Sequence, residues 1–333
     1  MKKTIVFILL ILIGCEDKIE PEHTSELIII ANEGNYGDGN GSINVFDGDN
    51  LIQTISNIGD VVQSILAYNN KLFVLSNNSH TIKRFSISNS GLALPGIEVS
   101  TNNSSPREMV ILNNKLYFTN WNTKDIKVLN LETFLIEQSL PINGIPEDIV
   151  TDGEFLWVSC PNINLYDKNN GTSIIKIDPL TLQIINRYIV GRGPQNMIID
   201  QNRLLVSRSY YDDAWKAFYG TSSIDLINNE VIIIEYGASL VCGGDIMKVN
   251  QSIYRTFDGG VAPVNPDLSL NRSLKIGTFN NLYSAGSNID WIFLGVSDYV
   301  APDTVMVHNS AGELIYNHVV DVLPGDYIVW TKN

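Results

Sequence analysis

Leu116-Tyr-Phe-Thr-Asn120, followed by Ile126-Lys-Val-Leu-Asn130 and, after a further turn, by Gly144-Ile-Pro146, sets the pattern that decides the fold. The first of these runs is rich in aromatic and apolar residues, as a buried strand requires. Runs of the same shape recur along the chain at Lys71–Ser76, Lys115–Asn120, Phe155–Cys160, Arg203–Arg208, Ser252–Phe257 and Trp291–Val296. A strand-rich unit repeated at intervals is therefore the organising feature of the sequence.

The turns that precede these runs recur at a nearly constant interval. Pro106, Pro146, Pro194 and Gly243 lie at matching positions about 40–49 residues apart, and Pro324 follows two such units later. Residues 27–330 divide into seven units of about 43 residues, whereas six or eight units fit the turns less well. Four short strands in each unit are typical of a β-propeller. We therefore predict an all-β fold, a seven-bladed β-propeller with four antiparallel strands per blade.

The two ends of the repeat region complement each other. Leu27–Asn32 matches the second strand of a unit that lacks its first strand, and Leu323–Trp330 matches a lone first strand. We expect the C-terminal strand to complete the first blade, because this closure leaves no unpaired strand edge at the joint. The sixth blade has the weakest pattern, since Pro263 and Pro266 interrupt its third strand.

The first residues have the features of an export signal. Lys2 and Lys3 precede an apolar run, Thr4–Ile13, that is too short for a permanent membrane span. The run ends in Leu12-Ile-Gly-Cys15, which resembles a bacterial lipoprotein signal with its lipidated cysteine. The predicted divisions are a signal peptide at 1–14, lipidated Cys15 with a flexible tether at 15–26, and the propeller at 27–333.

The predicted tether is polar and acidic, with the sequence Glu16-Asp-Lys-Ile-Glu-Pro-Glu-His-Thr-Ser-Glu26. Acidic residues directly after the cysteine resemble surface-export signals of some Gram-negative lipoproteins. We therefore predict a protein of the outer membrane, anchored by its N-terminal lipid and exposed at the cell surface.

Composition excludes several classes of partner. The chain has 333 residues, 44% of them hydrophobic, and a formal net charge of −14. This acidity argues against a nucleic-acid partner and against docking on an anionic membrane through a basic face. The apolar fraction is ample for a core, and three cysteines exclude a disulfide framework. No nucleophile motif appears, so we do not expect an enzyme.

Two sequence features resemble a known family. Leu116–Asn120, with the runs that follow it, resembles the YVTN-type propeller repeat. Asn32-Glu-Gly-Asn-Tyr-Gly37, with Asn40-Gly-Ser42 after it, resembles a signature in a family of surface lipoprotein propellers. Members of that family include cobalamin-capturing lipoproteins that sit over an outer-membrane vitamin transporter. The resemblance implies a small-molecule ligand, cobalamin or a related corrinoid, that is delivered to such a transporter.

The loops between the second and third strands of a propeller open on the same face as the loops between blades. In this chain they concentrate aromatic and amide residues, above all in blades four and five. Aromatic rings offer apolar faces to a ligand, and asparagines offer donors and acceptors to an amide-rich one. The alternative is that these rings pack the loops onto the blades beneath. The candidate ligand-binding residues are Asn35, Tyr36, Asn120, Trp121, Asn122, Tyr166, Tyr210, Tyr211, Trp215, Phe218, Tyr219, Phe257 and Tyr299.

The densest group of these residues is Tyr210–Tyr219, for which a short helix is considered. Replacement of Trp215 and Tyr211 by Ala would weaken binding if this stretch forms the site.

A second set lies two residues past each inter-blade turn and faces the predicted channel. Its members are Ser64, Glu108, Asp148, Asn196, Asp245, Ser284 and Asp326. The carboxylates and the amide among them would suit Ca²⁺, and the pattern resembles that of calcium-dependent lactonases on propeller folds. The reading that we favour is that these side chains accept hydrogen bonds from backbone amides at strand starts. The possible metal ring consists of Glu108, Asp148, Asn196, Asp245 and Asp326, and no other metal or cofactor is expected.

Two further functions stay open beside ligand capture. A cation-dependent hydrolase would use the channel-mouth carboxylates and lose activity when Asp148 or Asp245 is replaced. A protein–protein interaction scaffold would bind a partner on the same face and show no affinity for small ligands.

Overall fold

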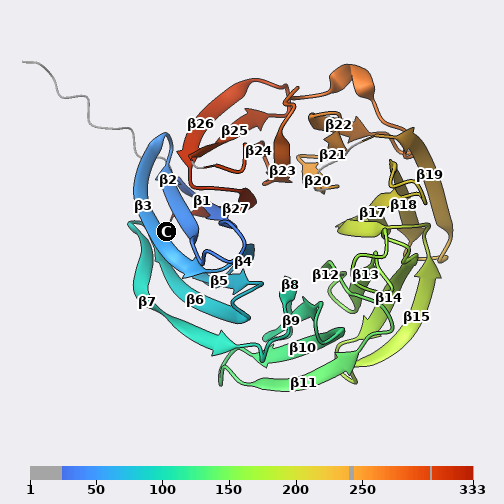
Figure 1. Ribbon diagram of the computed structural model, residues 1–333, viewed down its shortest axis with the longest axis horizontal. Coiled ribbons are helices and arrows are strands. Elements are labelled where there is room, and N and C mark those ends of the chain that lie inside the picture. The colour runs from blue at the N-terminus through green and yellow to red at the C-terminus, as the bar shows by residue number, and fades with distance from the viewer. Residues whose placement is uncertain (1–24, 240–243, 301, 333) are drawn as a thin grey trace, which may run out of the picture.

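The computed structural model describes residues 25–239, 244–300 and 302–332. They form seven antiparallel sheets that follow one another around a central channel in chain order (Figure 1). In the described residues the one helical element is a 3-10 turn, η1 (Arg272–Leu274). The prediction of an all-β, seven-bladed propeller is confirmed.

In blades 2 to 7 the strands follow chain order from the channel outward, whereas in blade 1 the last strand of the chain is innermost (Figure 1). Blade 1 contains β27 (Pro324–Thr331), β1 (Glu26–Asn32), β2 (Gly41–Asp47) and β3 (Asn50–Gly59). Blade 2 contains β4 (Val62–Tyr68), β5 (Lys71–Ser76), β6 (Thr81–Ser88) and β7 (Gly91–Ser100). Blade 3 contains β8 (Pro106–Leu112), β9 (Lys115–Asn120), β10 (Asp125–Asn130) and β11 (Ile136–Pro141).

The second half of the ring repeats this order. Blade 4 contains β12 (Ile149–Thr151), β13 (Leu156–Cys160), β14 (Ser173–Asp178) and β15 (Gln183–Ile189). Blade 5 contains β16 (Pro194–Asp200), β17 (Arg203–Tyr211), β18 (Ala217–Asp225) and β19 (Val231–Ala238). Blade 7 contains β23 (Leu282–Ser287), β24 (Trp291–Val296), β25 (Asp303–Asn309) and β26 (Leu314–Val320).

Blade 6 is the irregular one, as its weak pattern indicated. Its sheet has three strands, β20 (Ile246–Val249), β21 (Ser252–Phe257) and β22 (Gly260–Val264). The isolated bridges Val264↔Leu270 and Val261↔Ile276 take the place of a fourth strand. Pro263 lies within β22, and a proline cannot donate a hydrogen bond to a neighbouring strand. The missing hydrogen-bond donor explains why the third strand is short and why only isolated bridges lie on its outer side.

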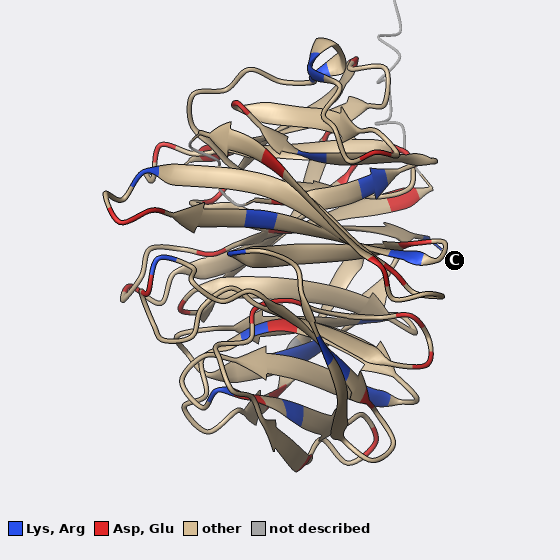
Figure 2. Ribbon diagram, turned by 90° about the vertical axis from the view of Figure 1, so that its right-hand side faces the viewer, with Lys and Arg blue, Asp and Glu red and all other residues tan. Residues whose placement is uncertain are grey.

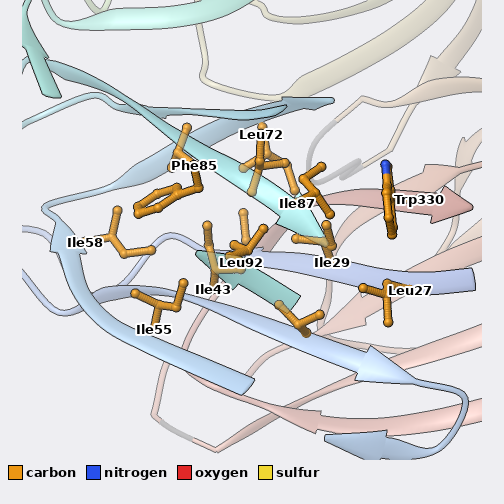
Figure 3. Close-up of a cluster of buried hydrophobic side chains, with 14 of the residues drawn as sticks. Leu27, Ile29, Ile43, Ile55, Ile58, Leu72, Phe85, Ile87, Leu92 and Trp330 are labelled. Carbon is orange, nitrogen blue, oxygen red and sulfur yellow. The ribbon is translucent and has the colours of Figure 1, made fainter. Parts of the chain in front are cut away.

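The middle strands of the blades are buried along nearly their whole length. In β5 and β9 every residue but the first is buried, and in β13 every residue is buried. The reason is that each blade packs between two others. The largest apolar cluster joins blades 1 and 2 and includes Leu27, Leu72, Phe85 and Trp330 (Figure 3). Burial on both faces explains why these strands appear in the sequence as continuous apolar runs.

The C-terminal strand completes blade 1, as predicted. β27 pairs with β1 from Glu26↔Thr331 to Asn32↔Pro324. The backbone N–H of Lys332 donates to the carbonyl of Ser25 at 2.8 Å, so both described ends of the chain lie together. We call this face of the ring the bottom face, and Figure 2 shows the C-terminal end at it. The opposite face, which carries the inter-blade turns, is the top face.

The predicted lipid anchor, Cys15, lies in residues 1–24, outside the described residues, as does the predicted signal peptide. Among the residues that are described, no helix has the length and apolarity needed to cross a membrane.

Candidate functional site

The top face is built from two sets of loops that hydrogen-bond to each other. These are the inter-blade turns and the loops between the second and third strands of each blade. Backbone bonds of 2.8–3.0 Å join Trp121 N to Ser105 O, Ile145 N to Asn162 O, and Ser209 N to Gly193 O. Side chains on both sets of loops therefore lie on one continuous surface.

A polar cavity of about 610 Å³ lies on the axis of the ring. Its lining includes the predicted channel-mouth residues Glu108, Asp148, Asn196, Asp245 and Asp326. The innermost strands place these side chains at equivalent positions, so the ring predicted from the repeat faces one shared space.

The three aspartates of this ring bind backbone amides of the next blade. Asp326 Oδ2 accepts from Ile65 N at 2.8 Å, Asp148 Oδ2 from Met197 N at 2.6 Å, and Asp245 Oδ2 from Ala285 N at 2.8 Å. Two of them also accept from local amides at strand starts, as we expected: Asp148 Oδ1 from Ile149 N at 2.7 Å and Asp326 Oδ1 from Tyr327 N at 2.8 Å. Within the described ranges, no group of three or more His, Cys, Asp and Glu side chains could hold a metal ion. Calcium binding at the ring stays a prediction.

Removal from water raises the pKa of every carboxyl group of this ring. Burial raises the pKa of Asp148 and of Asp245 to about 7 and that of Asp326 to about 6. Burial, and then the nearby charges of Asp326 and Asp148, raise the pKa of Glu108 well above its usual value. The folded protein therefore binds protons at this ring more tightly than the unfolded chain does.

These shifts predict that stability increases as the pH falls from 8 to about 5. A carboxyl group whose folded pKa is raised stabilises the fold at low pH, and that stability is lost as the pH rises through 6 to 7. One pKa unit corresponds to about 1.4 kcal/mol, so the combined change is expected to be several kcal/mol. Urea unfolding at pH 5, 6, 7 and 8 measures it. Equal stability at pH 5 and pH 8 would contradict this role of the ring.

A second ring of polar side chains lies one residue before the first and was missed in the sequence. Arg107 Nη2 contacts Glu147 Oε1 at 2.6 Å, and Arg107 Nη1 donates to Gln63. The Arg107 guanidinium lies 4.2 Å from the ring centroid of Trp121, and Trp121 Nε1 donates to Glu147 Oε2 at 2.7 Å. Trp121, a predicted binding residue, therefore contacts two side chains that line the cavity.

The rim continues through blades 1 and 7. Glu33 lines the cavity and accepts a hydrogen bond from the Tyr283 hydroxyl, and burial raises the pKa of Glu33. The predicted residue Tyr299 lies edge-on to Tyr283 at 6.0 Å between ring centroids. The signal for Gln63, Arg107, Glu147 and Tyr283 was their place directly before a ring position, as in Gln63-Ser64 and Glu147-Asp148. Glu33 lies in the blade-1 loop and has no such signal.

Tyr210–Tyr219 is a β-hairpin, so the helix considered for it is wrong. β17 continues to Tyr211 and β18 begins at Ala217, so that Tyr210 lies opposite Phe218. Asp212 Oδ1 accepts from the backbone N–H groups of Ala214 and Lys216 at 2.9 Å each, which fixes the turn between the strands. The pairing of aromatic residues across the two strands therefore decides the structure of this stretch, although the spacing of these residues would also suit a short helix.

The aromatic residues of this hairpin pack on one another and reach blade 6. Ring centroids lie 5.7 Å apart for Tyr210 and Phe218, 5.8 Å for Tyr211 and Trp215, and 6.2 Å for Tyr219 and Phe257. Trp215 is 60% exposed, and Tyr166 in the blade-4 loop is 85% exposed. These rings offer accessible apolar faces, whereas Tyr219 is buried at 2% and supports the loops instead.

The other predicted residues lie apart from this cluster. Asn120 is fully buried, and its Nδ2 donates to the carbonyls of Phe118 and Asp125, so it holds the blade-3 hairpin. Asn122 Nδ2 donates to Asn103 O at 3.3 Å. Asn35 and Tyr36 lie in the blade-1 loop, where Tyr36 is 78% exposed. Ring contacts therefore join the predicted residues of blades 5 and 6, whereas Asn35, Tyr36, Asn120 and Asn122 lie in blades 1 and 3.

Comparison with solved structures finds propellers at low sequence identity. Apo AztD from Citrobacter koseri is 10% identical with a TM-score of 0.57, over 92% of this chain and 97% of that one. BamB from Moraxella catarrhalis is 12% identical with a TM-score of 0.55, over 88% and 82%. A candidate 6-phosphogluconolactonase from Bacteroides fragilis is 11% identical with a TM-score of 0.59, over 92% and 98%. At these identities the likeness establishes the fold alone.

No protein-family model matches the sequence, and no curated protein matches it. The expectation of a YVTN-type, cobalamin-capturing lipoprotein therefore continues as a proposal.

Proposed function

We propose that this protein is a surface lipoprotein that captures a planar, amide-bearing ligand on its top face, with a corrinoid as the first candidate. Delivery of the ligand to an outer-membrane transporter completes the proposal. The observation that carries it is the group of aromatic rings around the blade-5 hairpin, of which Trp215 is 60% exposed. A large exposed ring held in place by neighbouring rings favours a ligand with a broad apolar surface.

The cavity beside these loops supports the same ligand class. Its lining includes the amides Gln63, Gln195 and Asn196, which can donate to and accept from the amides at the edge of a corrin ring. A volume of about 610 Å³ lies within the range of small-molecule sites. The cavity would take peripheral groups of the ligand while the aromatic rings of the hairpin contact its flat face.

The path of the chain supports a top face that points away from the membrane. Ser25 lies at the bottom face beside Lys332. A lipid on Cys15 would therefore attach the protein to the membrane on the side of its bottom face, through a short segment of chain. The aromatic loops lie at the opposite end of each blade and would stay accessible from outside the cell.

Calorimetric titration of cobalamin into the soluble chain that begins at Glu16 tests this proposal. We expect saturable one-to-one binding, weakened about tenfold or more by Trp215→Ala, because an exposed ring contributes most when a ligand covers it. Tyr68→Ala, at the bottom end of β4, is the matched control and should bind as tightly as the wild type. Absence of heat at about 50 μM cobalamin would remove corrinoids as the ligand.

The hydrolase alternative depends on a cation at the carboxylate ring. The hydrogen bonds that Asp148, Asp245 and Asp326 accept from amides of neighbouring blades give these groups a structural role instead. A Ca²⁺ titration of the same protein separates the two functions, because only the hydrolase requires saturable binding of the cation. The scaffold alternative would be favoured by a protein partner recovered without any small-ligand affinity.

A further inference from the structure

Arg107 lies at the top end of the axial cavity, the polar space of about 610 Å³ on the axis of the ring, and its neighbours fix its position. Its Nε and Nη2 donate to Glu147 Oε1 at 3.1 and 2.6 Å, and its Nη1 donates to Gln63. The guanidinium lies over the ring of Trp121, 4.2 Å from the centroid. Trp121 Nε1 donates to Glu147 Oε2 at 2.7 Å. One carboxylate, that of Glu147, therefore holds both the guanidinium and the indole.

This arrangement leaves part of the guanidinium available to a ligand. A guanidinium has five N–H groups, and Arg107 uses three of them in the bonds to Glu147 and Gln63. The other two have no acceptor in the part of the chain that the structure describes. The side-chain amide of Asn196, which lines the same cavity, has no hydrogen-bond partner among the described residues either. The cavity thus offers hydrogen-bonding groups that the protein leaves unused.

The cations of the cavity are neutralised by the protein itself. The described lining contains two, Arg107 and Lys248. Arg107 contacts Glu147, and Lys248 contacts Asp200, both at 2.6 Å. An anionic group on a ligand would therefore find no unpaired cation here, although Arg107 can still donate hydrogen bonds.

The remaining carboxyl groups of the cavity hold protons more tightly than usual. In the described ranges five of them line the cavity without an ion pair, namely Glu33, Glu108, Asp148, Asp245 and Asp326. Removal from water raises the pKa of each, to about 7 for Asp148 and Asp245 and to about 6 for Asp326. At pH 6 most of these groups are therefore uncharged. A charged ligand group of either sign would lose its hydration there without gaining a counter-ion.

We propose that Arg107 is the specificity-determining residue of the axial cavity and selects an uncharged carboxamide of the captured ligand over a charged group. The inference rests on the proposed capture function and names the group that enters the cavity. The free N–H groups of Arg107 donate to the amide oxygen, and carboxyl oxygens such as those of Glu108 accept from the amide nitrogen. Glu147 is the positioning residue, because it fixes the plane of the guanidinium and cancels its charge.

Three small probes with the same ring and different charge test the selection. Benzamide carries an uncharged amide, benzoate a carboxylate and benzylammonium a cation. Each is titrated by NMR into the chain that begins at Glu16, at about pH 6. We expect benzamide to bind about tenfold more tightly than either charged probe, because only the amide exchanges its hydration for hydrogen bonds without an uncompensated charge.

Replacement of the positioning residue should change the selection rather than abolish binding. Glu147→Gln retains an acceptor for Trp121 but leaves the charge of Arg107 uncompensated. We expect benzoate to bind about tenfold more tightly to this variant, and benzamide about threefold more weakly, because the guanidinium is now free to pair with a carboxylate. Structural damage alone would weaken both probes.

Two further variants complete the series. Arg107→Gln should weaken benzamide about tenfold without improving benzoate, and Arg107→Lys should restore part of the loss, since an ammonium donates but lacks the planar fork. Glu98→Gln is the matched control. Glu98 is an ion-paired glutamate on the outer strand β7, 3.1 Å from Lys83, so its replacement should leave the preference for benzamide unchanged.

The outcomes distinguish this inference from the proposed function. A preference for benzamide that depends on Arg107, with no heat from cobalamin, would support the selection and remove the corrinoid. Binding of cobalamin, with no benzamide binding at about 10 mM or with equal binding of the three probes, would overturn the selection and leave capture intact. Tightest binding of benzoate or benzylammonium would assign the cavity to a charged group and overturn the selection as well.

Discussion

Deletion of residues 323–333 is expected to leave a chain that no longer unfolds in one cooperative transition. The deletion removes β27, so β1 loses its partner along Glu26–Asn32. It also removes Trp330 from the cluster that joins blades 1 and 2 (Figure 3). The hydrogen bond that Ile65 N donates to Asp326, which links the same two blades, is lost as well. A ring opened at one blade exposes apolar faces and unpaired strand edges on both sides of the gap.

A rearranged chain provides the control for this deletion. Residues 323–332 can be placed directly before Ser25, because Lys332 N and Ser25 O are 2.8 Å apart in the intact protein. This permuted chain retains every strand and every contact of β27 but moves its ends to the top face. It should regain a single thermal transition near that of the wild type. A deletion variant with an unchanged melting curve would show that the terminal strand does not hold the ring closed.

Replacement of Arg208 by Ala is expected to lower the free energy of unfolding by about 3–5 kcal/mol. Arg208 lies in β17 and is fully buried. Its Nη1 contacts Glu235 Oε1 at 2.7 Å, and its Nη2 donates to the carbonyl of Ile234 at 3.0 Å. The variant would lose these bonds and leave a cavity beside Gly191 and Gly220, whose missing side chains make room for the guanidinium.

Urea unfolding measures this effect, with Arg187→Ala as the matched control. Arg187 is an exposed arginine on the outer strand β15, so its loss should change stability by less than about 0.5 kcal/mol. The midpoint of the Arg208 variant should fall without a change in the slope of the transition. A loss below about 1 kcal/mol would contradict the role of Arg208 as a buried link between blade 5 and the preceding turn.

The blade count and the closure of the ring could be predicted from the sequence because both depend on local pattern. Middle strands such as β9 are covered on both faces and appear as apolar runs at a fixed spacing. The unmatched strands Leu27–Asn32 and Leu323–Trp330 could only complete each other in a closed ring. The weak pattern of blade 6 also had a local cause, since Pro263 lies in its last strand.

The details of the candidate site depend on contacts between distant residues, which the sequence does not display. The hairpin at Tyr210–Tyr219 has the aromatic spacing of a short helix, but its pairing with β19 and its fixed turn at Asp212 decide otherwise. The rim residues Arg107 and Glu147 are forty positions apart, and only the packing of adjacent blades brings them together. Asn120 was grouped with exposed loop residues, although its side chain is buried in the blade and donates a hydrogen bond to the carbonyl of Phe118.

Hydrogen exchange of the whole chain, with and without cobalamin, tests the central claim most directly. The claim is that a ligand binds on the top face at the seam of blades 4 and 5. The account predicts slower exchange in the loop 161–172 and in the hairpin 209–219 when cobalamin is present, with no change at bottom turns such as 69–70 and 113–114. Unchanged exchange throughout the chain, or protection confined to the bottom face, would contradict it.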